Sequence, residues 1–181
     1  MPTYVAMLRG INIGPSKRVE MARLKKMFES LGLRNVRTYI QSGNVVFEGR
    51  GAATAVAKKI EKGMMEEFGF SALIMMRTEE EMARAIANNP FVEQGQKNPG
   101  YVHVCFLAGI PAAEAVKKLH ALGTKAEQVK CAGNEAYVYH LEGLGKAKVL
   151  THTVLERVLG VKVTMRNWNT SSRLWEMARE F

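Results

Sequence analysis

The sequence contains no aspartate, and all 17 of its acidic residues are glutamate. Chemistry that depends on the shorter carboxylate is therefore excluded: aspartyl-phosphate intermediates, magnesium sites built on Asp, and Ser-His-Asp triads. Cysteine is scarce as well, because Cys105 and Cys131 are the only two and lie far from a Cys-x-x-Cys spacing. We expect two reduced thiols, with neither a zinc site nor a redox pair.

Long hydrophobic runs are also missing. No stretch approaches the 18 apolar residues that a membrane-spanning helix needs, so the sequence predicts a cytoplasmic protein that makes no membrane contact. The four histidines lack the spacing typical of metal ligands, and neither a P-loop nor a dinucleotide-binding glycine motif is present. The sequence therefore predicts no metal and no cofactor.

What the sequence does contain is an internal repeat. An apolar run ending in Gly-Ile, a Gly-Asn turn between strand-like runs, and a Met-Arg pair before a helix each occur twice in the same order. These landmarks are residues 4–11 and 101–110, Ser42-Gly43-Asn44 and Ala132-Gly133-Asn134, and Met76-Arg77 and Met165-Arg166. The second and third recur after 90 and 89 residues, and this near-constant offset predicts two halves of the same architecture.

The hydrophobic pattern of the first half predicts the order strand, helix, strand, strand, helix, strand. Short apolar runs mark the strands, and apolar residues at helical spacing mark the helices. The strands are expected at 4–8, 36–40, 45–47 and 72–76, and the helices at about 21–31 and 56–68. This is the order of a ferredoxin-like plait, an α+β fold in which helices cover one face of an antiparallel sheet. Thr78 and Glu81 fit a capping box, which predicts an extra helix to about Asn89.

The second half repeats this order. Pro90 and the polar stretch 93–99 predict a linker, strands follow at 101–107, near 129 and 137, and at 161–165, and a final helix is expected after Asn169. We therefore predict two tandem ferredoxin-like halves (βαββαβ, alpha-beta plaits) from an internal duplication, each followed by an extra helix. Residues 1–90 form the first half with its appended helix, and residues 91–181 form the linker and the second half with the C-terminal helix.

Three motifs, residues 8–14, 37–47 and 166–170, resemble the signatures of one family. In this order and over nearly the whole chain, they make the sequence similar to the mostly bacterial family catalogued as domain of unknown function 1697. The resemblance implies a compact α+β fold of two plait-like halves, with no agreed activity, substrate or cofactor. The loop here reads Gly14-Pro15-Ser16-Lys17, where similar sequences commonly carry a second glycine, and its proline removes one amide donor from any anion cradle.

The first candidate binding site is the loop of residues 9–18, which precedes a helix and carries Arg9, Asn12 and Lys17. Helix N-termini bind anions through their free amides and the positive end of the helix dipole. The basic side chains would complete a site for a phosphate or a carboxylate. The alternative is a simple turn with solvated cations.

The second candidate site is the predicted hairpin turn, which carries Gln41, Ser42 and Asn44. Short amides and a hydroxyl can hydrogen-bond a base edge or a sugar hydroxyl. A tight turn also uses these residue types for its own backbone, and Gly43-Asn44 tolerates the positive φ that closes such a turn. These turn preferences favour the structural interpretation.

The third candidate site is Arg166, Asn167 and Trp168, immediately before the last helix. An indole beside a guanidinium can stack on a base or another ring. A tryptophan at a strand-to-helix corner also fills cores, and the two interpretations weigh equally. Asn169 or Thr170 is expected to cap the helix that follows.

The net charge of +9 and the isoelectric point near 9.7 favour a partner of opposite charge. We expect a binding protein for a phosphate-bearing ligand, either an anionic small molecule such as a nucleotide or a nucleic acid. One alternative is a small hydrolase or transferase acting on a phosphate or acyl group, in which Arg9 or Lys17 binds the oxyanion and Gln41 or Asn44 positions water. Another is a dimer scaffold, and the oligomeric state stays open.

Overall fold

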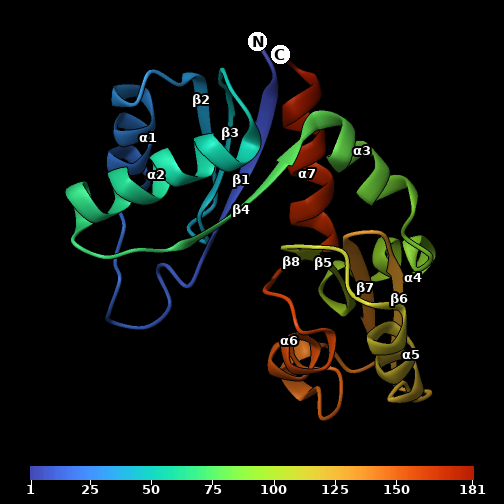
Figure 1. The fold of residues 1–181 in the computed structure, drawn as a ribbon. Helices are drawn as coiled ribbons and strands as arrows, with labels where there is room; N and C mark the ends of the chain where they lie inside the picture. The colour runs from blue at the N-terminus through green and yellow to red at the C-terminus, as the bar shows by residue number, and fades with distance from the viewer. The chain divides into compact units, whose positions relative to one another are not determined.

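The computed structural model describes residues 1–181 and contains two four-stranded antiparallel sheets with helices (Figure 1). Residues Met1–Arg84 and Leu174–Phe181 form the first compact unit, and residues Ala85–Arg173 form the second. The boundaries of the duplicated segments, 1–90 and 91–181, stay a prediction, because contacts group residues without regard to their origin. No helix combines the length and the apolar composition required to cross a membrane.

The first unit has the predicted plait. Its elements are β1 (Thr3–Arg9), α1 (Met21–Ser30), β2 (Arg34–Tyr39), β3 (Asn44–Glu48), α2 (Ala53–Phe68) and β4 (Leu73–Thr78). The strands pair antiparallel in the order β2-β3-β1-β4, and α1 and α2 lie on one face of the sheet (Figure 1). The tandem ferredoxin-like fold class is thus confirmed in this half.

Alternation along β1 explains why the helices cover that face. Tyr4, Ala6 and Leu8 point into the core under the helices, where Phe28 of α1 meets Phe47 of β3 edge to face at 5.3 Å. Each large apolar side chain that is fully buried there contributes about 1.5–3 kcal/mol to folding. The spacing of these residues in the sequence, two in strands and three to four in helices, is what predicted the elements.

The second unit has the same topology. Its elements are α4 (Val92–Lys97), the 3-10 helix η1 (Pro99–Tyr101), β5 (Val102–Leu107), α5 (Ala113–Ala121), β6 (Glu127–Ala132), β7 (Glu135–His140), the 3-10 helix η2 (Leu144–Lys146), α6 (His152–Leu159) and β8 (Val163–Asn167). The strand order β6-β7-β5-β8 repeats that of the first sheet position by position. The predicted linker was wrong in one respect, because most of residues 93–99 are helical.

Hydrogen bonding corrects the alignment of the two halves at one landmark. The amide of Leu8 donates to the carbonyl of Gly43, and the amide of the equivalent Leu107 donates to the carbonyl of Asn134. Gly43 and Asn134 are therefore equivalent, one residue away from the alignment that the two Gly-Asn pairs suggested. Asn44 accordingly corresponds to Glu135, so the second turn does not carry a copy of the first turn's buried amide.

Two helices follow the plaits. The capping box before α3 (Glu79–Ala87) is confirmed, since the Thr78 amide donates to Glu81 Oε2 at 2.8 Å and the Glu81 amide donates to Thr78 Oγ1 at 3.2 Å. The second half of the last helix, α7 (Trp168–Arg179), belongs to the first unit, which includes Leu174–Phe181. There Arg37 of β2 pairs with Glu180 at 2.6 Å and stacks its guanidinium 4.7 Å from the Phe181 ring centroid.

Candidate functional site

The loop between β1 and α1 is held by one side chain, Asn12. Its Nδ2 donates to the carbonyls of Val19 at 2.9 Å and Gln41 at 2.8 Å, and its Oδ1 accepts from the Val19 amide at 2.8 Å. Asn12 has a φ of 55°, a left-handed conformation that asparagine adopts more readily than most residues. The side chain therefore closes the loop on itself and joins it to the turn between β2 and β3.

That turn packs directly on the end of β1. Gly43 has a φ of 83°, and a Cβ placed on it would lie 2.6 Å from Ile11 Cδ1, so only glycine allows this approach. The second left-handed residue of the turn is Ile40, with a φ of 50°. The expectation that Asn44 shares the positive φ was wrong, because Asn44 is the first residue of β3. The structure thus brings the first two candidate groups together at one end of the first sheet.

The residues of the turn differ in what they offer a ligand. Asn44 is fully buried, and its Nδ2 donates to the Tyr39 carbonyl at 3.1 Å and to Ser42 Oγ at 2.9 Å. This supports the structural interpretation for Asn44 and for the Ser42 hydroxyl. The Gln41 side chain is exposed beside the loop and makes no hydrogen bond within the protein. Gln41 is therefore the turn residue best placed to meet a ligand.

The loop presents its cations outward. Lys17 and Arg18 are exposed, and neither forms an ion pair, although Lys17 Nζ lies 5.7 Å from the centroid of the Phe70 ring. Arg9 is half-buried at the end of β1. The residue before α1, Glu20, provides no side-chain cap, and the first turn of the helix carries no acidic residue. Helix amides and unpaired cations thus meet on one exposed, ordered loop.

Asn12→Ala is expected to release this loop. The substitution removes three hydrogen bonds at about 0.5–1.5 kcal/mol each and puts alanine in a left-handed conformation that it disfavours. We expect stability to fall by roughly 2–4 kcal/mol and amide exchange to accelerate over residues 10–19. Asn12→Gly is the control, because it keeps the φ and removes only the hydrogen bonds. Urea unfolding that is unchanged in both variants would contradict this role.

The third candidate group lies in the second unit, at the junction of β8 and α7. Asn167 Oδ1 accepts from the Thr170 amide at 2.8 Å, so Asn167 caps α7. The expected cap at Asn169 or Thr170 was wrong because the helix begins earlier, at Trp168. The Trp168 ring packs on α4, where a Cβ on Gly95 would lie 2.8 Å from the indole. This contact supports the core-filling interpretation of the tryptophan.

Arg166 is the remaining member of that group. Burial lowers its pKa to about 10, so the guanidinium stays protonated at neutral pH, and it donates to the Met165 carbonyl at 3.0 Å. Arg77 occupies the equivalent place in β4 and donates to the Met76 carbonyl at 2.8 Å. The repeated Met-Arg pair of the sequence is therefore a repeated strand-end arginine in the structure.

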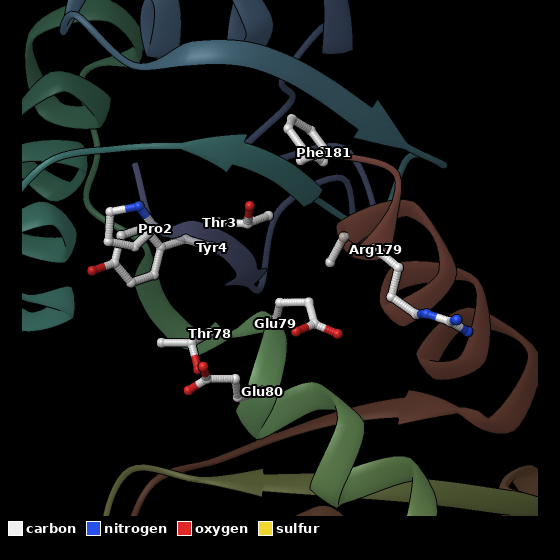
Figure 2. A pocket seen from close by; sticks show the side chains of 9 residues that line it. Pro2, Thr3, Tyr4, Thr78, Glu79, Glu80, Arg179 and Phe181 are labelled. Carbon is white, nitrogen blue, oxygen red and sulfur yellow. The ribbon is translucent and has the colours of Figure 1, made fainter.

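A large hollow in the first unit lies away from the residues that the sequence indicated (Figure 2). Its volume is about 710 Å³, and it lies between the start of β1, the β4–α3 junction and the end of the chain. Glu79, Glu80 and a single cation, Arg179, line it, so its charge does not favour a phosphate. The hollow is large, but size and position alone do not indicate which ligand it binds. The loop, with its exposed cations, is therefore the better candidate for an anion.

Comparison with known proteins places the chain in a family. The family profile described as "Protein of unknown function (DUF1697)" matches residues 1–137. The chain belongs to the DUF1697 family. The matched range includes the β1–α1 loop and the β2–β3 turn, whereas Arg166, Asn167 and Trp168 lie beyond it. The resemblance expected from the motifs is thus confirmed.

Solved structures resemble this DUF1697 protein, and one of them does so over its full length. It is the conserved bacterial protein SP0830 from Streptococcus pneumoniae, with a TM-score of 0.78, 21% identity, and coverage of 99% of each chain. At that identity the likeness shows the fold alone. No curated protein matches the sequence.

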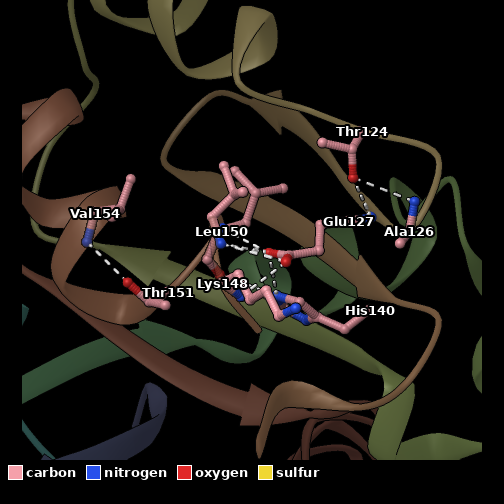
Figure 3. Close-up of polar contacts among 9 residues, drawn as sticks. Thr124, Ala126, Glu127, His140, Lys148, Leu150, Thr151 and Val154 are labelled. Carbon is pink, nitrogen blue, oxygen red and sulfur yellow. Dashed lines mark hydrogen bonds and ion pairs between the residues drawn. The ribbon is translucent and has the colours of Figure 1, made fainter. Parts of the chain in front are cut away.

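The second unit of this DUF1697 protein also holds a buried carboxylate that sequence reasoning missed (Figure 3). Glu127 accepts hydrogen bonds from three successive amides, those of Lys148, Val149 and Leu150, at 2.7–3.3 Å. Its Oε2 lies 3.9 Å from Nε2 of His140. Burial alone would raise the pKa of Glu127, but these backbone hydrogen bonds and His140 together hold it below the ordinary value. The carboxylate therefore binds the backbone of the segment that precedes α6.

Two histidines lie together beside this carboxylate. The rings of His103 and His140 meet edge to face at 6.4 Å, and each keeps a buried Nδ1 without a hydrogen-bond partner. Burial, with a smaller effect of His140, lowers the pKa of His103 to about 4. A Glu-His pair suggests general-base chemistry, but His140 is only 1% exposed and its Nε2 contacts the Leu150 carbonyl at 3.0 Å. Glu127 and His140 are therefore held by backbone contacts, which favours a structural role for this pair.

Proposed function

We propose that this protein binds a phosphate-bearing ligand, a nucleotide or a nucleic acid, at the exposed loop between β1 and α1. The observation that supports the proposal is that Lys17 and Arg18 are exposed and unpaired on a loop whose backbone Asn12 fixes. An ordered cationic loop loses little conformational entropy when an anion binds. The uncapped amides of α1 supply further donors.

The neighbouring turn supplies the second part of the proposed site. The Gln41 carbonyl is bound by Asn12, which places the exposed Gln41 side chain next to the loop. A carboxamide donates and accepts, so it suits a sugar hydroxyl or a base edge. The phosphate would contact the loop, and the rest of the ligand would extend toward Gln41.

The alternative of a hydrolase or transferase stays a prediction. It requires Gln41 or Asn44 to position water, and the amide of Asn44 is buried in contacts with Tyr39 and Ser42. Gln41 is the one of the two that reaches solvent. A carboxamide cannot accept a proton as a general base does, so the residues present support binding better than catalysis.

The proposal predicts binding that depends on salt. We expect a fluorescent single-stranded oligonucleotide to bind with a log Kd that rises linearly with log salt concentration, as measured by anisotropy. The double variant Lys17→Ala/Arg18→Ala should weaken binding about tenfold or more and reduce the salt slope by about two. Parallel titrations with ATP distinguish a nucleotide from a nucleic acid as the ligand.

A control separates the site from the net charge. Lys117→Ala/Lys118→Ala removes two exposed lysines from α5 in the second unit and changes the net charge equally. We expect this variant to bind within twofold of the unaltered protein. Equal losses in both double variants, or no binding of either probe at 50 mM salt, would refute the proposed site.

A further inference from the structure

A second group of cations surrounds a small hollow near the start of β1. The hollow has a volume of about 280 Å³, and Arg34, Arg50 and Lys59 line it together with apolar residues such as Leu31 and Val56. None of the residues that line it is acidic. Three cations therefore border one concavity with no carboxylate among them.

The hollow is far from the β1–α1 loop. Arg34 pairs in register with Glu48, which pairs with Thr3, so this row marks the amino end of β1. Asn44 pairs with Met7, and that row marks the carboxyl end, where the loop and the β2–β3 turn lie. At about 3.3 Å per residue, the two ends of this seven-residue strand are roughly 20 Å apart. A small ligand cannot occupy both places.

The ammonium group of Lys59 is held at the hollow. Its Nζ donates to the carbonyl of Leu31 at 2.5 Å, and Leu31 is the C-cap residue of α1. This contact orients the lysine and leaves two of the three ammonium donors for a ligand. An oriented cation loses less rotamer freedom on binding than a freely solvated one does.

The carboxylate that lies opposite Arg34 in the sheet does not pair with these cations. Glu48 lies opposite Arg34 in the ladder, yet its Oε2 accepts from Asn35 Nδ2 at 2.6 Å. Neither arginine forms an ion pair or a hydrogen bond through its side chain. Arg34 and Arg50 therefore keep their side-chain donors available for a ligand.

The first turn of α2 adds to this charge. Val56 lies in that turn and lines the hollow. Ala52 at the N-cap makes no side-chain hydrogen bond, and no acidic residue occurs in the first turn of this 16-residue helix. The positive end of the α2 dipole thus has no acidic side chain of its own helix beside it, although the C-terminal end of α1 at Leu31 and Gly32 borders the same hollow with the opposite polarity.

We propose that this hollow binds a small phosphorylated molecule with at least two negative charges, of the size of a diphosphate or a sugar phosphate. Lys and Arg together suit this ligand because the guanidinium binds phosphate oxygens bidentately and the ammonium acts as a point charge. Sites for larger ligands occupy about 300–1,000 Å³, so a volume of about 280 Å³ suits a small molecule better than an entire nucleotide. The site is independent of the function proposed for the loop.

Calorimetric titration of the full chain with inorganic pyrophosphate tests the proposal. We expect saturable binding at one site that Lys59→Met and Arg50→Gln each weaken at least tenfold. Lys62→Met is the control, since Lys62 lies on the same helix, is exposed and does not line the hollow. It should change Kd less than twofold. Arg50→Gln keeps the contact of Lys59 with Leu31, so a folding defect in Lys59→Met does not prevent the test.

A second measurement locates the ligand. Gly32 lines the hollow, and its amide signal in a nitrogen-15 spectrum should shift with pyrophosphate, whereas the signals of Gly10 and Gly14 in the loop should not. Binding lost in Lys17→Ala/Arg18→Ala but retained in Arg50→Gln would place the anion at the loop and overturn this inference. No heat at millimolar pyrophosphate, or equal weakening by Lys62→Met, would also overturn it while leaving the loop proposal intact.

Discussion

Glu127→Ala is expected to destabilise the second unit by about 3–5 kcal/mol, because it removes the acceptor of a buried hydrogen-bond network. The three amides that the carboxylate accepts from would lose their partner, and a buried unsatisfied donor costs about 1–3 kcal/mol. Leu150 is fully buried, so water cannot easily replace the lost acceptor there. Urea unfolding followed by circular dichroism measures the loss, and amide exchange should accelerate over residues 144–151.

Two variants define the origin of this effect. Glu127→Gln keeps an oxygen acceptor but no negative charge, so we expect it to lose less than half as much stability as Glu127→Ala. Glu142→Ala removes an exposed carboxylate from the same part of the chain and should stay within about 0.5 kcal/mol of the unaltered protein. An alanine variant at position 127 that is as stable as Glu142→Ala would show that the network contributes nothing.

We expect the second unit to lose stability as the pH falls from 6.5 to about 4, because folding lowers the pKa of His103. The pKa of His103 falls from 6.5 to about 4 in the folded protein. Between these values the unfolded chain binds the proton and the folded chain does not, so stability increases with pH. The stability that neutral His103 contributes is therefore fully present above pH 6.5 and declines as the pH falls to about 4. Below that pH, stability no longer depends on this group. The total loss is about 3 kcal/mol.

Denaturation at intervals of half a pH unit measures this dependence. His103→Gln should flatten the stability profile between pH 6.5 and 4, because it removes the titrating group. A separate decline should persist in both proteins below about pH 4.5, where Glu127 gains its proton as the pH falls through its lowered pKa. A profile of His103→Gln that parallels that of the unaltered protein would assign the acid sensitivity to other groups.

Periodicity was sufficient to predict the topology from the sequence. Apolar residues recur with strand spacing along β1 and with helical spacing along α1 and α2, and burial on one face requires that spacing. The capping box at Thr78 and Glu81 was also readable, because its partners lie within four residues of each other. Local rules therefore recovered the local structure.

Long-range contacts could not be predicted. Asn12 meets Gln41 across 29 positions, and nothing near Asn12 in the sequence indicates that partner. Glu127 has backbone amides as partners, and backbone amides carry no sequence signal. Gly95 was interpreted as a linker residue, whereas the Trp168 ring makes glycine necessary inside α4. In each of these three cases the role of the residue is set by a tertiary contact and not by its neighbours in the sequence.

The grouping of the last eight residues with Met1–Arg84 makes the first unit discontinuous in sequence, whereas Ala85–Arg173 form the second unit as one continuous segment. The contact of Arg37 with Glu180 in the first unit joins residues that are 143 positions apart. Closing a loop of that length costs conformational entropy before the contact forms. The first unit therefore bears an entropic cost of chain closure that the continuous second unit avoids.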